Sequence, residues 1–169
     1  MKNILFPILL LIISTQAIAQ QSKVGTVDSE FILSKMPELT KMQEELKAYN
    51  ANLEGELKIK VDDYQAKVKA YQEGVATMTE PMKKTKQEEI IALENDIAKF
   101  RQNGSQLVQI EQNRLLQPLY KKIGTALEEV AKAEGYTQIL TITSSGLAYV
   151  DPNFDLTKKV MTKLGIPLQ

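Results

Sequence analysis

Cysteine, histidine and tryptophan are all absent from the 169-residue sequence, and aromatic residues make up only 6% of it. Without Cys or His, the chain has no thiol nucleophile, no disulfide, none of the usual zinc or haem ligands and not the commonest general base. Basic and acidic residues balance at 21 each, so the total charge offers no basic footprint for a nucleic acid. These absences predict a protein that is not an enzyme and that uses no metal, no cofactor and no nucleic-acid partner.

Paired carboxylates are present, but they are placed poorly for catalysis. Glu44–Glu45, Asp62–Asp63 and Glu88–Glu89 are adjacent in sequence, and adjacent residues point in diverging directions on a helix. The chain also lacks a glycine-rich loop followed by a lysine, the device that cradles a phosphate. Acid–base catalysis and nucleotide binding are therefore not expected.

The first residues have the composition of a secretory signal peptide. Lys2 precedes an apolar run at residues 4–13, and residues 17–19 form a small-x-small cleavage site. A membrane anchor is the alternative, but the run is far shorter than the ~20 residues of a spanning helix, and Pro7 interrupts it. We predict a signal peptide at residues 1–19 and a mature protein that is soluble outside the cytoplasm.

Most of the mature chain carries a helical pattern of apolar residues. From about residue 41 to residue 134 they recur at alternating gaps of three and four, the period of a coiled coil. The pattern breaks at residues 77–81, and Pro81 disfavours helical backbone in the residue before it. We predict a long antiparallel helical hairpin, an arm at residues 41–118 with its tip near 77–84. The residues expected in the seam between the two helices are Leu39, Met42, Leu46, Tyr49, Leu53, Leu57, Val61, Tyr64, Val68, Tyr71, Val75 and Met78 in the first, and Ile90, Leu93, Ile97, Phe100, Leu107, Ile110, Arg114, Leu119, Ile123, Leu127 and Val130 in the second.

Short strands are expected only at the two ends of the chain. Residues 23–27, 136–143 and 147–150 are rich in β-branched or apolar residues and are bounded by turn residues, which predicts strands, the last two as a hairpin. With short helices they would form a small β/α body from residues 20–40 and 119–169. Such a core is too small to be stable alone, so we expect it to be completed by self-association. The apolar strand positions expected in the oligomer interface are Val24, Val27, Leu140, Ile142, Leu147 and Tyr149.

Prolines and glycines mark where the helices begin, bend and end. Pro37 suits the first turn of the first arm helix, where a missing N–H costs nothing. Pro118 lies inside the second helical pattern and predicts a kink or local break where the arm joins the body. Gly135 suits the left-handed position that follows a helix C-terminus, and Gly165 is expected to stop a last short helix.

Blocks at both ends of the chain resemble a known family. VGTVD at 24–28, MPE at 36–38, LLQPL at 115–119 and LAYVDP at 147–152 are similar to segments of the Skp/OmpH family of periplasmic chaperones for outer-membrane proteins. The resemblance implies a homotrimer whose intersubunit β body carries helical arms around a cavity for unfolded outer-membrane proteins. Familiar members are strongly basic, whereas residues 41–84 of this chain carry eight basic and eight acidic residues. Long-range attraction of acidic clients is therefore expected to be weaker here.

Apolar residues outside the seam are candidates for contact with a client. Ile59, Ile91 and Val108 lie off the predicted seam, where a branched side chain on a polar rod could contact an unfolded chain. Met78 and Met82, near the tip, could offer the soft surface that methionine gives to promiscuous binders. Single exposed apolar residues are common, however, and packing of the turn explains the methionines equally well.

Three lysines near the tip are candidates for contact with acidic partners. Lys83, Lys84 and Lys86 form the densest basic cluster and could bind anionic lipid headgroups or acidic clients. A solvated run of charges is the alternative explanation.

Two functions fit these features. The first is an ATP-independent periplasmic holdase that encloses unfolded outer-membrane proteins between helical arms. The second is a structural or adaptor coiled-coil protein of the cell envelope, whose arms dock a specific folded partner. Both need a long polar rod, so the residues alone separate them poorly.

Overall fold

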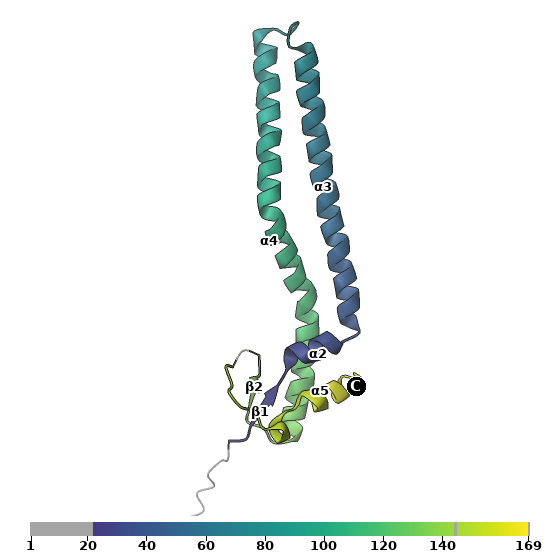
Figure 1. Ribbon diagram of the computed structural model, residues 1–169, viewed down its shortest axis with the longest axis vertical. Coiled ribbons are helices and arrows are strands. Elements are labelled where there is room, and N and C mark those ends of the chain that lie inside the picture. The colour runs from purple at the N-terminus through teal and green to yellow at the C-terminus, as the bar shows by residue number, and fades with distance from the viewer. Residues whose placement is uncertain (1–21, 144, 169) are drawn as a thin grey trace, which may run out of the picture.

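The computed structural model describes residues 22–143 and 145–168. Two long helices stand side by side and project from a small body that holds both ends of the described chain (Figure 1). Helix α3 (Glu38–Gly74) leads away from the body, and α4 (Glu80–Ala133) returns to it. The predicted mostly helical fold, with an antiparallel hairpin and a small sheet, is confirmed. The predicted signal peptide lies outside the described residues.

The seam predicted for the first helix is confirmed along its whole length. Met42 is buried, and the other predicted seam residues from Leu39 to Met78 are half-buried. At 1.5 Å per residue the 37 residues of α3 extend about 55 Å, and the 54 residues of α4 about 80 Å. The arm is therefore much longer than the body from which it projects.

The seam predicted for the second helix is wrong at two positions. Ile110 is 55% exposed and Arg114 is exposed, whereas Val108 and Leu115 are shielded. Along α4, one line of protected positions consists of residues 97, 100, 104, 108, 111, 115 and 119. These gaps give an eleven-residue repeat of 3.67 residues per turn, so a strict seven-residue repeat falls out of step with the helix surface here.

The turn at the tip occupies residues 75–79. The Thr77 N–H donates to the Gly74 carbonyl at 3.0 Å, and the Lys83 N–H donates to the Thr79 carbonyl at 3.0 Å. Pro81 lies in the first turn of α4, where its missing N–H leaves no hydrogen bond unmade. The chain therefore reverses direction where the break in the apolar pattern predicted a turn.

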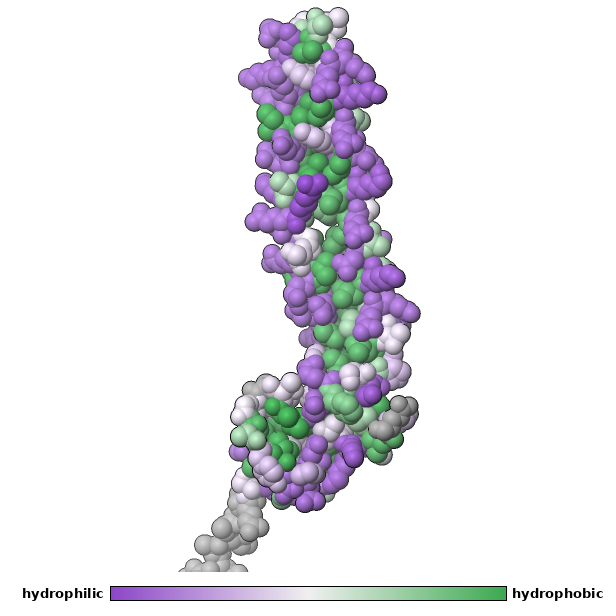
Figure 2. Space-filling model, viewed as in Figure 1, coloured by the Kyte–Doolittle hydropathy of each residue, from purple (hydrophilic) through white to green (hydrophobic). Residues whose placement is uncertain are grey.

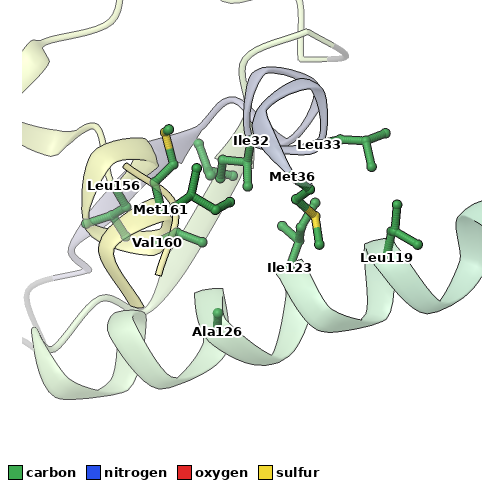
Figure 3. Packing of buried hydrophobic residues seen from close by; sticks show 11 residues of the cluster. Ile32, Leu33, Met36, Leu119, Ile123, Ala126, Leu156, Val160 and Met161 are labelled. Carbon is green, nitrogen blue, oxygen red and sulfur yellow. The ribbon is translucent and has the colours of Figure 1, made fainter. Parts of the chain in front are cut away.

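The core of the body is made by three helices. Helix α2 (Ser29–Lys35) begins where the Asp28 side chain accepts a hydrogen bond from the Phe31 N–H at 2.9 Å. It packs with α5 (Thr157–Lys163) against the last turns of α4 (Figure 3). The buried residues labelled in Figure 3 are Ile32, Leu33 and Met36, then Leu119, Ile123 and Ala126, then Leu156, Val160 and Met161.

The sheet has two parallel strands from the opposite ends of the chain. Strand β1 (Val24–Val27) pairs with β2 (Gln138–Thr141), with Val27 opposite Thr141. The other edge of β1 forms an isolated bridge from Thr26 to Asp155, just after the short 3-10 helix η2 (Pro152–Phe154). The two chain ends are therefore held together at the base of the arm, as predicted.

The strand predicted at residues 147–150 is not formed. After β2 the chain makes a helical turn in which the Ser145 N–H donates to the Thr141 carbonyl at 3.2 Å. A hairpin needs a tight turn that returns the chain alongside its partner, and this turn sends it away. Leu147 to Val150 therefore do not pair with β2, and the sheet keeps two strands in the described residues.

Glycines end two helices as the sequence predicted. Gly135 and Gly165 have φ of 72° and 73°, in the left-handed region. The Tyr136 N–H reaches the Ala131 carbonyl at 2.9 Å and the Ile166 N–H reaches the Met161 carbonyl at 2.9 Å, the pattern of the Schellman cap. Each cap turns the chain sharply back toward the body core.

Pro118 does not break α4, which continues from Glu80 to Ala133. Figure 1 shows the helix bent along its middle rather than straight.

Among residues 22–143 and 145–168, no helix combines the length and the hydrophobicity needed to cross a bilayer.

Candidate functional site

Polar contacts between the helices fix their register along the arm. Lys60 Nζ lies 2.6 Å from Asp96 Oδ2, and Lys67 Nζ lies 3.3 Å from Glu89 Oε2. Hydrogen bonding from Lys67 lowers the pKa of Glu89 below its usual value, and the charge of Lys67 adds to this effect. Solvent screens exposed pairs of this kind, so their main effect is alignment of the helices.

A hollow interrupts the apolar seam where α4 carries a glycine. Leu53 and Leu57 of α3 face Phe100 and Val108 of α4 around a space of about 240 Å³. A Cβ atom built on Gly104 would meet no heavy atom within 4 Å, so the missing side chain leaves open space. The hollow is a place where apolar seam residues can be reached from outside.

A second hollow lies further toward the tip. Val61 and Tyr64 of α3 and Ile97 and Ala98 of α4 line a space of about 330 Å³. Arg101 borders both hollows, so they are neighbours along the same line between the helices. In Figure 2 apolar side chains form a strip along the middle of the arm, between two polar borders.

The structure separates the predicted apolar client contacts into two groups. Ile59 is 70% exposed and Ile91 is 55% exposed, and Met82 is exposed near the tip. Val108 is not off the seam as predicted, because the shift in repeat brings it half-buried into the hollow beside Gly104. Met78 is half-buried, and its terminal methyl lies 2.7 Å from where a Cβ on Gly74 would stand.

The three tip lysines are each paired with a carboxylate of their own helix. Lys83 lies 2.7 Å from Glu80. Lys84 lies 3.9 Å from Glu88, and Lys86 lies 3.5 Å from Glu89. Glu80, Glu88 and Glu89 thus balance the lysines, and the cluster is a mixed surface of both charges.

Several apolar residues predicted for the oligomer interface are accessible in the single chain. Tyr149 is 78% exposed. Val24, Leu140 and Leu147 are also among the exposed large apolar residues, and Ile142 is half-buried. Val27 differs, because it lies in the core of its own chain with 1% exposure.

A charged contact supports the base of the arm near Pro118. Glu38, at the start of α3, accepts a hydrogen bond from Lys122 of α4. This hydrogen bond lowers the pKa of Glu38, as does a backbone hydrogen bond of Glu38 itself. Pro118 lines a shallow hollow beside them, together with Arg114.

Sequence reasoning missed the two hollows. Six of their lining residues, Leu53, Leu57, Val61, Tyr64, Ile97 and Phe100, are correctly predicted as seam residues, but a seam is expected to be closed, and Val108 is predicted outside it. The available signal was Gly104 inside a long helical pattern, since an interior helical glycine costs stability and often has a packing or functional reason. Within the described part of the chain, no group of three or more acidic residues is placed to hold a metal ion.

Comparisons with known proteins agree with this architecture. A family model described as "Outer membrane protein (OmpH-like)" matches residues 23–164. A crystal structure from Caulobacter crescentus CB15, of a protein assigned as an outer membrane chaperone (OmpH-like), superposes with a TM-score of 0.66 at 17% sequence identity. The match covers 85% of this chain and 83% of the other, and at this identity it shows a shared fold. No curated protein sequence matches the chain.

Proposed function

Because this chain belongs to the OmpH-like family of outer membrane proteins, we propose that it is an ATP-independent holdase chaperone of the periplasm. Its clients are unfolded outer-membrane proteins, which it encloses between helical arms. The observation that carries the proposal is the two-helix arm, whose apolar strip is accessible between charged borders far from the body (Figure 2). The Caulobacter protein of the same fold, assigned as an outer membrane chaperone, supports it.

The holding assembly is a homotrimer. Its support is the set of apolar side chains that one chain leaves accessible on the body, among them Val24, Leu140, Leu147 and Tyr149. Burial of large apolar side chains such as these is worth roughly 1.5 to 3 kcal/mol each. Three bodies joined through them would carry three arms from one base, with Pro118 at each junction between arm and body.

Clients are held by many weak contacts rather than by one strong site. Ile59, Ile91 and Met82 each present an isolated apolar side chain on a polar rod. Several such contacts act together when arms confine one client, because confinement raises the effective concentration of each contact. No step requires a nucleotide, since sheltering an unfolded chain is a binding equilibrium.

The tip is a second place of contact in this proposal. Lys83, Lys84 and Lys86 meet acidic client segments or an anionic membrane surface at short range. Their pairing with carboxylates makes this contact weak and sensitive to salt. Replacing all three with Gln should therefore change client affinity little at physiological salt. Loss of client binding in this variant would instead make the tip the principal site.

An aggregation assay tests the proposal against the structural or adaptor alternative. Several unrelated unfolded outer-membrane proteins are diluted from urea, and light scattering is followed with and without the mature protein. Suppression of scattering for all of them at near-stoichiometric amounts, without ATP, is the expected result. An unrelated helical protein of similar mass is the control. Suppression of none of the clients, or of a single one, would favour the adaptor.

A further inference from the structure

The two hollows form one groove along the arm, defined here as the arm groove. Its floor is made by Leu53, Leu57, Val61 and Tyr64 of α3 and by Ile97, Ala98, Phe100, Gly104 and Val108 of α4. We propose that the arm groove binds one extended segment of an unfolded polypeptide whose large apolar side chains are four residues apart. This inference rests on the proposed function and deepens it, because it names the part of the arm and the pattern of client that meet.

The distance between the hollows sets the spacing of the side chains that can fill them. The lining residues of the two hollows are centred about ten residues apart on α3 and about six apart on α4. At 1.5 Å per residue, this places the hollows roughly 9 to 15 Å apart. Residues i and i+4 of an extended chain are about 13 Å apart and point to the same side. One extended segment can therefore place an apolar side chain in each hollow.

The rim of the arm groove carries polar groups that match an extended backbone. Glu54 borders one hollow, Glu94 borders the other, and Arg101 stands between them. Within residues 22–143 and 145–168, none of the three forms an ion pair, so their side chains can bind a ligand. An extended segment has a row of unpaired N–H and C=O groups. The carboxylates can accept hydrogen bonds from the N–H groups, and the guanidinium can donate hydrogen bonds to the C=O groups.

The chemistry of the groove selects an alternating sequence. The hollow beside Gly104 has a mainly apolar lining, and the hollow beside Ala98 has a mixed lining in which Val61, Tyr64 and Ile97 are the apolar part. Two side chains four residues apart enter the hollows, and the side chains between them point to solvent and can be polar. Strands of outer-membrane barrels alternate apolar and polar residues in this manner. A segment of an unfolded outer-membrane protein is thus the occupant that fits both the spacing and the rim.

Filling the groove tests the proposal directly. The variants Gly104→Leu and Ala98→Leu each place a side chain in one hollow. Gly55→Leu is the matched control, because Gly55 is an exposed helical glycine of the same arm, lines neither hollow and also has nothing within 4 Å of a built Cβ. Circular dichroism verifies that all variants keep their helix content.

The probe is a fluorescent peptide with aromatic residues at i and i+4 and Ser or Thr elsewhere, titrated by anisotropy. Gly104→Leu and Ala98→Leu should weaken its binding about tenfold, as expected when an aromatic side chain loses its buried site. Gly55→Leu should bind as the wild type does. A peptide of identical composition with the aromatics at i and i+3, on opposite sides of the chain, should bind more weakly. Equal binding of both peptides, unchanged binding in Gly104→Leu, or no binding to the wild type would each overturn the proposal.

The aggregation assay separates this inference from the function on which it rests. If the wild type suppresses aggregation and the peptide does not bind, the arm groove is not the client site and the chaperone function stands. If the peptide binds with the i and i+4 preference but aggregation is not suppressed, the groove stands and the holdase function fails.

Discussion

Gly25 lies where β1 passes against an aromatic ring. A Cβ built on Gly25 would approach Tyr136 Cε1 to 2.7 Å and Ile139 Cδ1 to 3.0 Å. The ring cannot move away freely, because Lys23 Nζ lies 4.0 Å from its centroid and donates to the Glu134 carbonyl at 2.8 Å. The glycine therefore permits β1 to pack closely on Tyr136, in the segment between α4 and β2.

We expect Gly25→Ala to destabilise the protein by about 1 to 3 kcal/mol, the usual cost of overpacking a fitted site. Urea unfolding followed by circular dichroism measures this change. Gly124→Ala is the control, because a Cβ there meets nothing within 4 Å and the helix should gain up to about 1 kcal/mol. Equal effects of the two substitutions would mean that the contact with Tyr136 has no energetic weight.

Glu38 should make stability depend on pH in the acid range. Its pKa is lowered from the ordinary 4.5 by the hydrogen bond from Lys122, so the folded state binds fewer protons than the unfolded state. The stability that this pair contributes is present above pH 4.5 and is lost as pH falls through the lowered pKa of the folded state. The melting temperature should therefore decrease as the pH is lowered below 4.5. In the Glu38→Gln variant the melting temperature should decrease less steeply over the same pH range. Parallel profiles for the two proteins would contradict this assignment.

At the scale of the elements, the repeat of α4 decides which isoleucines hold the arm together. Ile97 is buried in the seam and Ile110 is on the exposed surface, although a seven-residue repeat assigns both to the seam. Ile97→Ala should cost about 2 to 4 kcal/mol through a cavity. Ile110→Ala should change stability by about 0.5 kcal/mol or less. Shifts in the urea midpoint measure both changes in stability. Similar losses in the two variants would mean that Ile110 also packs in the seam, as the seven-residue repeat predicts.

The element scale also shows how far local signals reach. Pro37, the break before Pro81, and Gly135 and Gly165 predicted helix boundaries correctly, because capping depends on a few neighbouring residues. The strand predicted at 147–150 is not formed, because a strand exists only when it pairs with a neighbour, and the helical turn after β2 takes the place of the tight turn of a hairpin.

At the scale of the whole molecule, the exposed apolar side chains of the body predict an obligate oligomer. Leu140→Asp places a charge on an accessible position of β2. Only one edge of β2 is paired, because the sheet has two strands in the described residues. We expect this variant to dissociate or unfold, because burying a carboxylate in an apolar interface is strongly unfavourable.

Multi-angle light scattering measures the outcome, and Ile59→Asp is the control on an exposed arm position. The wild type and Ile59→Asp should both have the mass of a trimer. A folded wild-type monomer at micromolar concentration would refute the oligomer, and a Leu140→Asp protein of unchanged mass and helix content would place the interface elsewhere.

The sequence by itself determined the helical hairpin, its turn, its caps and the seam of α3, because periodicity and capping are local properties of the chain. Only the tertiary structure decided that Val108 rather than Ile110 faces α3, that β1 and β2 pair in parallel, and that Gly104 and Ala98 open hollows in the seam. Each of these depends on which residues of distant segments meet. A one-residue drift of the repeat over several turns, or one missing side chain opposite Leu53, changes the surface without changing the local pattern.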